Sequence, residues 1–425
     1  MSSFVVKEKE LQEGLKVVLI PRQEVLTATL LVLIGAGSRY ETDRQAGLSH
    51  FLEHMFFKGT KNRPTTKEIA EAIDNIGGEF NAFTGEEYTG FYVKVAASQL
   101  LTGMDVVADI LLNPLFPAEE IERERGVIIE EIRMYTDAPM HHISHLWQQV
   151  LFGRHPLGRR IDGSIETVSK FKRNDFIKYT KQHYHTRNAV VAVAGNYDEA
   201  KVVGLLQGMF AKLPGGKETV PRRAPGVLPQ HKFIKEVRDN IDQTHMIVGV
   251  PGVRLDDDRR FAANLLAIIL GGGMSSRLFI SIRERHGLAY AVHTGVQAYV
   301  DAGGFATQLG VRSEKSDQAL ILVFEEYDRV MNEAVLESEL KKAKEMIKGR
   351  LLLDLEETNA LAQFAGVQAL LQKKIETPEQ LMKNYNTVSA EEIKKLAQEL
   401  LVPSKRAVAV LGPNKSIERV QKVWH

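Results

Sequence analysis

Residues 30–55 read LLVLIGAGSRYETDRQAGLSHFLEHM, and residues 245–270 read HMIVGVPGVRLDDDRRFAANLLAIIL. Each stretch begins with an apolar run of strand length, continues through a glycine, an arginine and an acidic loop, and ends in an amphipathic helical pattern. One such unit in each half of the chain indicates two related domains rather than a solenoid. When the two stretches are roughly superposed, His50 falls near Leu265. Only the first half therefore has a histidine at this position.

One segment has the composition of a linker. Residues 214–229 read PGGKETVPRRAPGVLP and hold four of the chain's 14 prolines. Proline fixes φ and removes a backbone donor, so this segment cannot continue a helix or a central strand. The sequence therefore predicts a first domain over 1–213, a linker over 214–229 and a second, homologous domain over 230–425.

The local patterns mix helices with antiparallel hairpins. Thr65 and Glu68 form a capping box ahead of a helical row that ends at the glycines 77–78. EFNAFT (79–84) and YTGFYVKV (88–95), joined by a short turn, are typical of a strand hairpin. The mixture favours an α+β fold of two homologous domains, each an antiparallel sheet packed with helices, over a doubly wound parallel sheet.

Composition excludes several classes of function. The chain has 55 Lys and Arg against 54 Asp and Glu, which argues against a dedicated nucleic-acid binder. It has no cysteine, so a metal would need His and carboxylate ligands. No apolar run reaches the ~18 residues of a membrane span, and the N-terminus has neither signal-peptide nor transit-peptide features. We therefore expect a cytoplasmic protein without membrane or nucleic-acid partners.

The segment AGLSHFLEHMFF (46–57) carries the strongest chemical pattern. On a helix, His50 and His54 lie one turn apart on one face, and two imidazoles at that spacing can share a zinc ion. Glu53 projects toward the same side, where a general base is needed to deprotonate metal-bound water. The arrangement is the inverted zincin motif. The alternative interpretation is a core helix with two hydrogen-bonded histidines and an ion-paired glutamate.

A third ligand is expected on the helix predicted over PAEEIERERGVIIEEIRMY (117–135), because catalytic zinc usually has three protein ligands. Glu124 and Glu131 lie two turns apart along one face of that helix. Glu131 would bind the metal, and Glu124 would orient a ligand from behind. Glu130 points about 100° away from Glu131. Taken alone, the segment is more simply interpreted as an acidic stripe on a solvated helix.

The motifs together resemble those of a known family. HFLEH followed by Glu131 after 76 intervening residues is similar to the pitrilysin/insulinase zinc peptidases. The length and the two-domain layout resemble the processing-peptidase-like branch of that family. Three further segments extend the resemblance over most of the chain: GGEFNAFTGEEYTGFYVKV (77–95), HPLGRRIDG (155–163) and LGGGMSSRLFISIRERHGLAYAV (270–292).

The resemblance implies a role for each candidate residue of HFLEH (50–54) and of the helix predicted over 117–135. His50, His54 and Glu131 would be the ligands of one zinc ion per chain. Glu53 would be the general base, and Glu124 would support the ligands from outside the coordination sphere. With these roles the protein would be a zinc metalloendopeptidase with an inverted HxxEH motif.

The same resemblance implies a substrate site. Asn81 and Ala82 would offer backbone groups to an extended peptide, which then adds to the sheet as a strand. Arg283 and Tyr290 would contact the substrate carbonyl and the developing oxyanion. From the residues alone, Arg283 is equally typical of a surface ion pair and Tyr290 of a core position.

The predicted function is zinc-dependent hydrolysis of extended peptides or unfolded segments inside a closed chamber. By the same resemblance the chain equals one half of longer family members, so a homodimer is expected, with a heterodimer as the alternative. Two other functions stay open: a non-catalytic binding or assembly subunit of the same fold, and a dedicated presequence-processing peptidase. The histidines after the ligand helix are interpreted as local packing residues rather than a second metal site; they are His141, His142 and His145.

Overall fold

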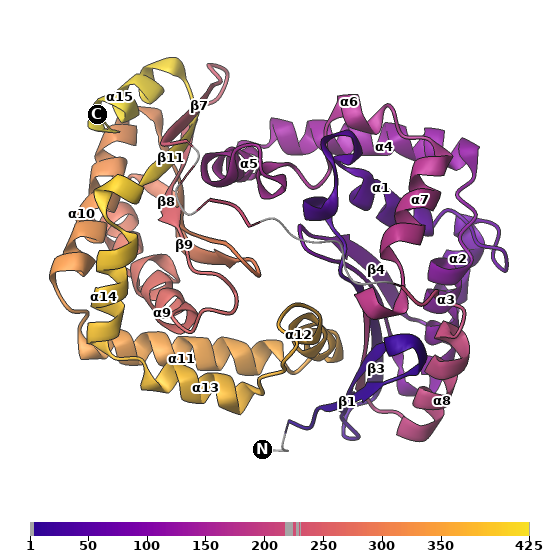
Figure 1. The fold of residues 1–425 in the computed structure, drawn as a ribbon. Helices are drawn as coiled ribbons and strands as arrows, with labels where there is room; N and C mark the ends of the chain where they lie inside the picture. Colours follow the sequence, from indigo (N-terminus) through magenta and orange to yellow (C-terminus); the bar gives the residue numbers. More distant parts are fainter. Residues whose placement is uncertain (1–3, 217–223, 227–228, 230, 425) are drawn as a thin grey trace. The chain divides into compact units, whose positions relative to one another are not determined.

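The computed structural model describes residues 4–216, 224–226, 229 and 231–424. It divides into two compact units, each built around one β-sheet with helices (Figure 1). The first unit comprises Met1–Ile132, Arg160–Arg222 and Leu351–Pro378, and the second comprises Arg133–Arg159, Arg223–Arg350 and Glu379–His425. The predicted α+β class, with one sheet in each of two domains, is confirmed.

The first sheet has the strand order β1-β2-β6-β3-β5-β4. Its strands are β1 (Lys7–Glu10), β2 (Lys16–Pro21), β3 (Thr27–Ile34), β4 (Glu79–Thr84), β5 (Thr89–Ala96) and β6 (Ala189–Gly195). Neighbouring strands are antiparallel except for the parallel pair β2 and β6. β4 is an edge strand, and within the described part of the chain no strand pairs with its outer side.

The second sheet repeats this topology with the order β7-β11-β8-β10-β9. Its strands are β7 (Phe233–Val237), β8 (Gln243–Pro251), β9 (Ala289–Ala298), β10 (Gly303–Arg312) and β11 (Ala407–Gly412). Here too one pair is parallel, β7 with β11. The order matches β2-β6-β3-β5-β4 strand for strand, which supports the predicted duplication. Leu265, the counterpart expected for His50, is buried on α9 (Arg260–Gly271).

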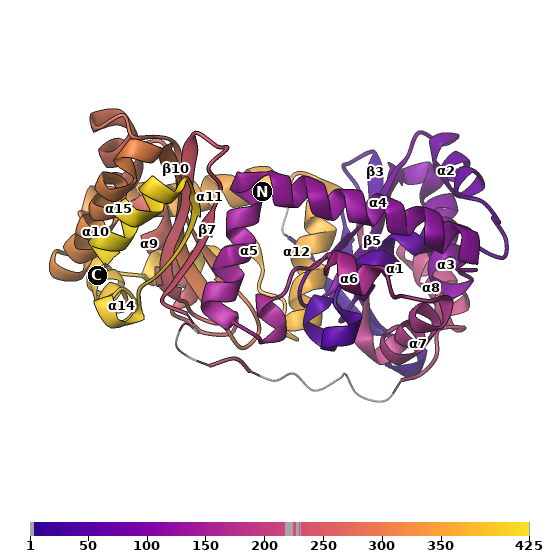
Figure 2. The same ribbon diagram turned by 90° about the horizontal axis from the view of Figure 1, so that it is seen from above.

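The helices surround the sheets as Figures 1 and 2 show. Those of the first unit are α1 (Leu48–Phe56), α2 (Thr66–Asp74), α3 (Leu100–Leu112), most of α4 (Ala118–Asp137), α6 (Ile165–Val168), α7 (Arg173–His183), α8 (Glu199–Phe210) and α12 (Thr358–Leu371). Those of the second unit are α5 (Pro139–Phe152), α9, α10 (Ser316–Asn332), most of α11 (Glu337–Asp354), α13 (Pro378–Thr387), α14 (Ala390–Leu400) and α15 (Asn414–Trp424). Over the described residues, none of these helices has both the length and the apolar composition that crossing a bilayer requires.

Alternating side chains of β3 explain why the first sheet needs helices on both faces. Leu30 and Val32 point into a core shared with α1 and α3, whereas Leu31 and Leu33 point into a second core shared with α12. Gly366 lets α12 lie close to the sheet, because a Cβ atom there would be 2.9 Å from Leu33 Cδ1. Both faces of β3 are therefore buried in apolar cores.

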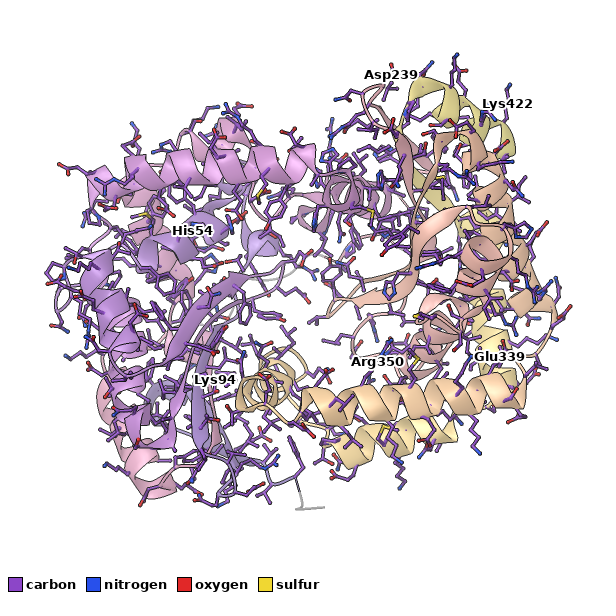
Figure 3. The ribbon with its side chains drawn as sticks, turned by 180° about the vertical axis from the view of Figure 1, so that it is seen from behind. His54, Lys94, Asp239, Glu339, Arg350 and Lys422 are labelled. Atoms are coloured by element: carbon purple, nitrogen blue, oxygen red, sulfur yellow. The ribbon has the colours of Figure 1, made fainter. Side chains whose placement is uncertain are left out.

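The helix on the second face of each sheet comes from the other half of the sequence. α12 covers the first sheet, and α5 covers the second sheet with side chains such as Ile143 and Trp147. Figure 3 labels Lys94 on β5 beside α12, and Lys94 Nζ lies 3.3 Å from Glu357 Oε2 at the start of α12. Each half of the chain thus completes the other's core.

The boundaries of the units differ from those expected. The sequence predicted continuous domains over 1–213 and 230–425, joined by the linker 214–229, whereas the compact units exchange α5 and α12 across that linker. The physical reason is that each central strand is apolar on both faces, and the helix that covers its second face comes from the other half of the sequence. Residues 217–223 and 227–228 of the predicted linker lie outside the described residues.

Two local predictions are confirmed. The Thr65 hydroxyl accepts a hydrogen bond from the Glu68 amide at 3.2 Å, and the Glu68 carboxylate accepts one from the Thr65 amide at 2.9 Å, so the capping box starts α2. The hairpin forms from β4 and β5, with Asn81 opposite Tyr92 in the register.

Candidate metal centre

α1 presents its polar residues together because its other side is buried. The side chains that fill the core are Phe51, Leu52, Met55 and Phe56. At helical spacing these apolar positions leave His50, Glu53 and His54 partly exposed on the remaining face. The sequence pattern thus determines which side of the helix carries the chemistry.

The start of α1 is fixed by a side chain from the preceding loop. The carboxylate of Glu41 accepts hydrogen bonds from the backbone N–H groups of Gly47 (2.9 Å) and Ser49 (2.6 Å). A carboxylate at this end satisfies donors that the first helical turn leaves free and complements the helix dipole. Gly47 has φ +94°, and a Cβ atom there would lie 2.7 Å from the Asp162 carbonyl oxygen. The helix that bears the motif is therefore held firmly at its beginning.

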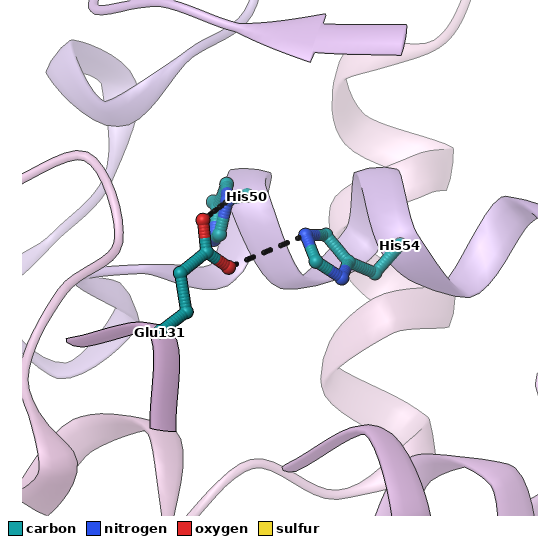
Figure 4. A group of neighbouring side chains, drawn as sticks. All are labelled: His50, His54 and Glu131. Atoms are coloured by element: carbon teal, nitrogen blue, oxygen red, sulfur yellow. Dashed lines mark ion pairs between the residues drawn. The ribbon is translucent and has the colours of Figure 1, made fainter. Parts of the chain in front are cut away.

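His50, His54 and Glu131 converge as the sequence predicted (Figure 4). His50 Nε2 lies 3.7 Å from Glu131 Oε1, and His54 Nε2 lies 3.8 Å from Glu131 Oε2. One potential ligand atom from each residue lies within 4.8 Å of the other two. No other group of three or more His, Asp or Glu side chains among the described residues is arranged in this way.

The distances fit a shared metal ion. At 3.7 and 3.8 Å the two nitrogen–oxygen separations are too long for hydrogen bonds. They suit atoms that each bind one zinc ion at about 2.0–2.2 Å. Two imidazoles and one carboxylate are also a donor set of catalytic zinc, with a coordination position left for water. The residues present therefore fit zinc.

Glu124 and Lys58 hold one of the imidazoles from behind. The Nδ1–H of His54 donates to Glu124 Oε1 at 2.8 Å, and Glu124 Oε2 lies 2.6 Å from Lys58 Nζ. In the neutral imidazole this hydrogen bond keeps the proton on Nδ1, so that Nε2, which faces Glu131, is free to bind a metal. Although burial opposes the shift, the carboxylates around the ring raise the pKa of His54. Glu124 thus lies where the sequence placed it.

The site contains several carboxylates and is partly shielded from water. Burial, together with the neighbouring His54, lowers the pKa of His50 to about 4, so this imidazole is neutral at pH 7. Burial raises the pKa of Glu53, although a hydrogen bond from Thr84 opposes that shift. Burial also raises the pKa of Glu131. A cation placed among these carboxylates would offset the cost of burying their charge.

Glu131 and its neighbour Glu130 provide a matched pair for testing the ligand assignment. Glu131→Gln is expected to weaken zinc binding at least about 100-fold, because losing even an outer residue typically costs 10–100-fold. Glu130 is exposed on α4, so Glu130→Gln should keep the wild-type affinity. Zinc affinity is measured by chelator competition. Equal losses in both variants would show that the wrong face of α4 has been assigned.

Asn81 and Ala82 lie on the edge strand β4. The Ala82 N–H donates to the side-chain oxygen of Asn81 at 2.9 Å. Thr84, the last residue of β4, donates its hydroxyl to Glu53 Oε2 at 2.5 Å. The free strand edge therefore reaches the candidate metal centre itself.

Arg283 and Tyr290 belong to the second unit, where they contact each other. Arg283 Nη1 donates to the Tyr290 carbonyl oxygen at 2.7 Å. Its guanidinium carbon lies 4.9 Å from the ring centroids of both Phe279 and Tyr290. Arg283 lies on a π-helical turn over Phe279–Arg285, a conformation that is frequent at functional sites. Tyr290 is 80% exposed, which excludes the core interpretation of this residue.

The other histidines considered above make local contacts. His142 Nε2 lies 2.7 Å from Glu236 Oε2, and His145 Nε2 lies 3.0 Å from Gln149 Nε2. His141 stacks against Tyr135 at 5.8 Å between ring centroids. Together these contacts favour packing and hydrogen bonding over a second metal site.

Three residues that shape the centre were not predicted from the sequence: Lys58, Thr84 and Glu41. Lys58 follows His54 by four residues, a spacing that signals proximity on a helix. Thr84 shares strand parity with Phe80 and Ala82, which points it to the same face of the sheet. No sequence pattern indicated the role of Glu41, because its partners are backbone amides rather than side chains.

Comparisons with known proteins agree with this picture. Residues 16–164 match the family model described as insulinase (peptidase family M16), and residues 170–347 match the model described as peptidase M16 inactive domain. An uncharacterized zinc protease of Streptomyces coelicolor is 33% identical over 96% of this chain and 90% of its own. The uncharacterized zinc protease YmxG of Bacillus subtilis is 34% identical over 96% of this chain and 99% of its own.

Solved structures share the fold. A crystal structure described as a peptidase M16 inactive domain from Pseudomonas fluorescens aligns with a TM-score of 0.89 at 21% identity, covering 96% of this chain and 98% of that one. At this identity the structural likeness speaks for the fold alone. The sequence relatives, which span nearly the whole chain at 33–34% identity, carry the assignment. The chain belongs to the insulinase family of peptidases, family M16.

Proposed function

We propose that the protein is a zinc-dependent endopeptidase that hydrolyses extended peptides or unfolded segments. The observation that carries this proposal is the convergence of His50, His54 and Glu131 beside Glu53. Membership of a peptidase family supports the reaction class. Relatives named zinc proteases support the choice of metal.

Each residue of the centre has a distinct task in this proposal. His50, His54 and Glu131 hold one zinc ion per chain, which when bound acidifies water and polarises a carbonyl group. Glu53 accepts the proton of the attacking water and then gives it to the leaving amine. Glu124 keeps His54 in the tautomer that leaves Nε2 free as a ligand.

The edge strand β4 supplies the substrate site. An extended peptide would pair with the outer backbone groups of Asn81 and Ala82 and so add a strand to the first sheet. Because Thr84 of the same strand contacts Glu53, a peptide bound there would run next to the candidate base. A segment that is already paired on both sides within a folded sheet cannot also pair with β4, so unfolded or extended segments are the expected substrates.

Arg283 and Tyr290 complete the site from a second copy of the chain. Tyr290 is 80% exposed, and the Arg283 side chain is also open to solvent, so both can meet a partner. A closed two-fold homodimer would place this pair of each chain at the zinc centre of the other and enclose a chamber. A heterodimer with an inactive partner is the alternative outcome. We expect this assembly in the cytoplasm.

A non-catalytic role in an assembly is the main competing function. Such a role does not require a working metal centre. In this chain the proposed zinc donors lie together, Glu53 is on the same helix as two of them, and Glu124 contacts His54 and Lys58. This completeness favours catalysis.

Metal removal tests the function directly. Purified protein should contain about one zinc ion per chain and cleave unfolded peptides from a library. A chelator should abolish cleavage, and added zinc should restore it. Elemental analysis and mass spectrometry of the digest provide the measurements. Cleavage that persists after the zinc has been removed would refute the proposal, and a single cleaved sequence motif would indicate a dedicated processing enzyme instead.

A further inference from the structure

Thr84 makes the single hydrogen bond that the described residues offer to the carboxylate of Glu53. Its hydroxyl donates to Glu53 Oε2 at 2.5 Å. The second oxygen, Oε1, receives no such bond within the described chain. Both side chains are half-buried, so the contact is sheltered from bulk water.

The strand pleat explains why Thr84 faces α1. Phe80 and Ala82 pack against the core that contains α1, whereas Phe83 packs against the core on the opposite face. Thr84 has the parity of Phe80 and Ala82, so it points to the α1 side. The hydroxyl is therefore directed at Glu53 by the same alternation that buries its neighbours.

One loop fixes both partners of this hydrogen bond. The turn after Thr84 is held by the Ser38 N–H, which donates to the Gly85 carbonyl at 3.2 Å, and by the Arg39 N–H, which donates to the Glu86 carbonyl at 2.9 Å. A buried ion pair between Arg39 and Glu87, 2.8 Å long, adds to this anchor.

The same loop continues into the start of α1. Glu41, two residues after Arg39, caps the helix that carries Glu53. Gly37 is required at the beginning of the loop, because a Cβ atom there would lie 2.3 Å from the Gly85 carbonyl oxygen. The strand end and the helix start are thus tied to one short segment, over residues 37–41. Such support on both sides is what a preorganised site requires.

We infer that Thr84 is a positioning residue for Glu53. By holding Oε2, the hydroxyl fixes the carboxylate plane and leaves Oε1 as the oxygen that takes the proton from water. Without this bond, no hydrogen bond from the described residues would hold the Glu53 carboxylate, and its torsional freedom would average over unproductive orientations. This inference rests on the proposed peptidase function for its kinetic consequence, but the contact itself can be tested without catalysis.

Paired substitutions separate the hydroxyl from the shape of the side chain. Thr84→Val keeps the shape and loses the donor, whereas Thr84→Ser keeps the donor. Thr84→Val should lower kcat on the order of 10-fold, a part of the 10²–10⁴-fold that a general base contributes, with KM changed less than about twofold. Thr84→Ser should restore kcat to nearly the wild-type value. Thr84→Ala serves as a second variant without the donor.

Thr89→Val is the matched control. Thr89 lies directly opposite Thr84 in the hairpin, and its hydroxyl donates to the Ala36 carbonyl at 2.8 Å. This variant also loses a buried hydroxyl from the same hairpin, so it should lower the melting temperature while leaving kcat unchanged. A similar fall in kcat for Thr89→Val and Thr84→Val would reveal a merely structural role and overturn the inference.

Crystal structures of the metal-free variants provide a readout independent of turnover. In Thr84→Ser the serine hydroxyl should remain within hydrogen-bond distance of Glu53, and in Thr84→Val the Glu53 carboxylate should be rotated or disordered. An unmoved Glu53 in Thr84→Val, or a wild-type kcat, contradicts the positioning role. If the wild-type protein cleaves no peptide, the proposed function fails, and the two crystal structures still decide whether Thr84 orients Glu53.

Discussion

Replacing Glu53 by Gln should lower peptide turnover by about 100-fold or more while zinc content stays at the wild-type level. Gln has nearly the same shape and can still accept the Thr84 hydrogen bond that Glu53 accepts in the structure. It cannot take a proton from water, however. The expected loss is therefore confined to kcat, with the metal centre intact by elemental analysis.

Two outcomes would contradict the role of Glu53. A wild-type rate in Glu53→Gln would remove Glu53 as the base. A loss of zinc along with activity would mean that this residue acts on the metal centre rather than on the proton. Glu131→Gln is the natural comparison, because it should lose zinc and activity together.

Mixing two inactive variants should restore about one quarter of the wild-type activity if the catalytic site is shared between the chains of a homodimer. His54→Ala destroys the zinc centre of its own chain, and Arg283→Ala removes the cation stacked between Phe279 and Tyr290. Random exchange makes about half of the dimers mixed, and each mixed dimer has one intact composite site out of two. Each variant alone should be nearly inactive.

A second mixture controls for nonspecific rescue. His54→Ala and Glu53→Gln alter the same centre on α1, so their mixed dimers contain no intact composite site and should stay inactive. Subunit exchange is verified by native mass spectrometry of differently tagged chains. No recovery in the first mixture, despite complete exchange, would contradict the shared site without affecting the zinc assignment.

The pairing of candidate residues along each helix was predictable from the sequence, because helical periodicity alone determines it. His50 and His54 are four residues apart and Glu124 and Glu131 seven apart, so each pair shares a helix face whatever the tertiary structure is. The meeting of the two helices was not predictable from spacing. It came from the family resemblance, and the structure brings Glu131 to within 3.7 and 3.8 Å of the imidazoles.

The supporting contacts were missed for a different reason. Thr84 and Glu41 act on groups distant in sequence, through hydrogen bonds whose geometry depends on how a turn and a loop fit together. Neither residue belongs to a periodic pattern. The spacing of Lys58, four residues after His54, was a partial indication of proximity. It was not a sufficient one, because α1 ends at Phe56, before Lys58.

The fold class was predicted more accurately than the division of the chain into domains. Apolar strands, glycine turns and capping boxes indicated two α+β halves, and the repeated strand order agrees with that duplication. The exchange of α5 and α12 could not be predicted from local sequence patterns. The apolar face of an amphipathic helix indicates that this face is buried, but it does not identify the sheet against which the helix packs.

The exchange of α5 and α12 also makes each half of the chain depend on the other for its core. A chain cut within 214–229 would leave Leu31 and Leu33 of the first sheet without α12, and Ile247 and Leu411 of the second without α5. Each fragment would then present a wide apolar surface to water. Neither half is therefore expected to fold stably when produced alone, and a substitution that loosens α12 or α5 should weaken a core built mainly by the opposite half.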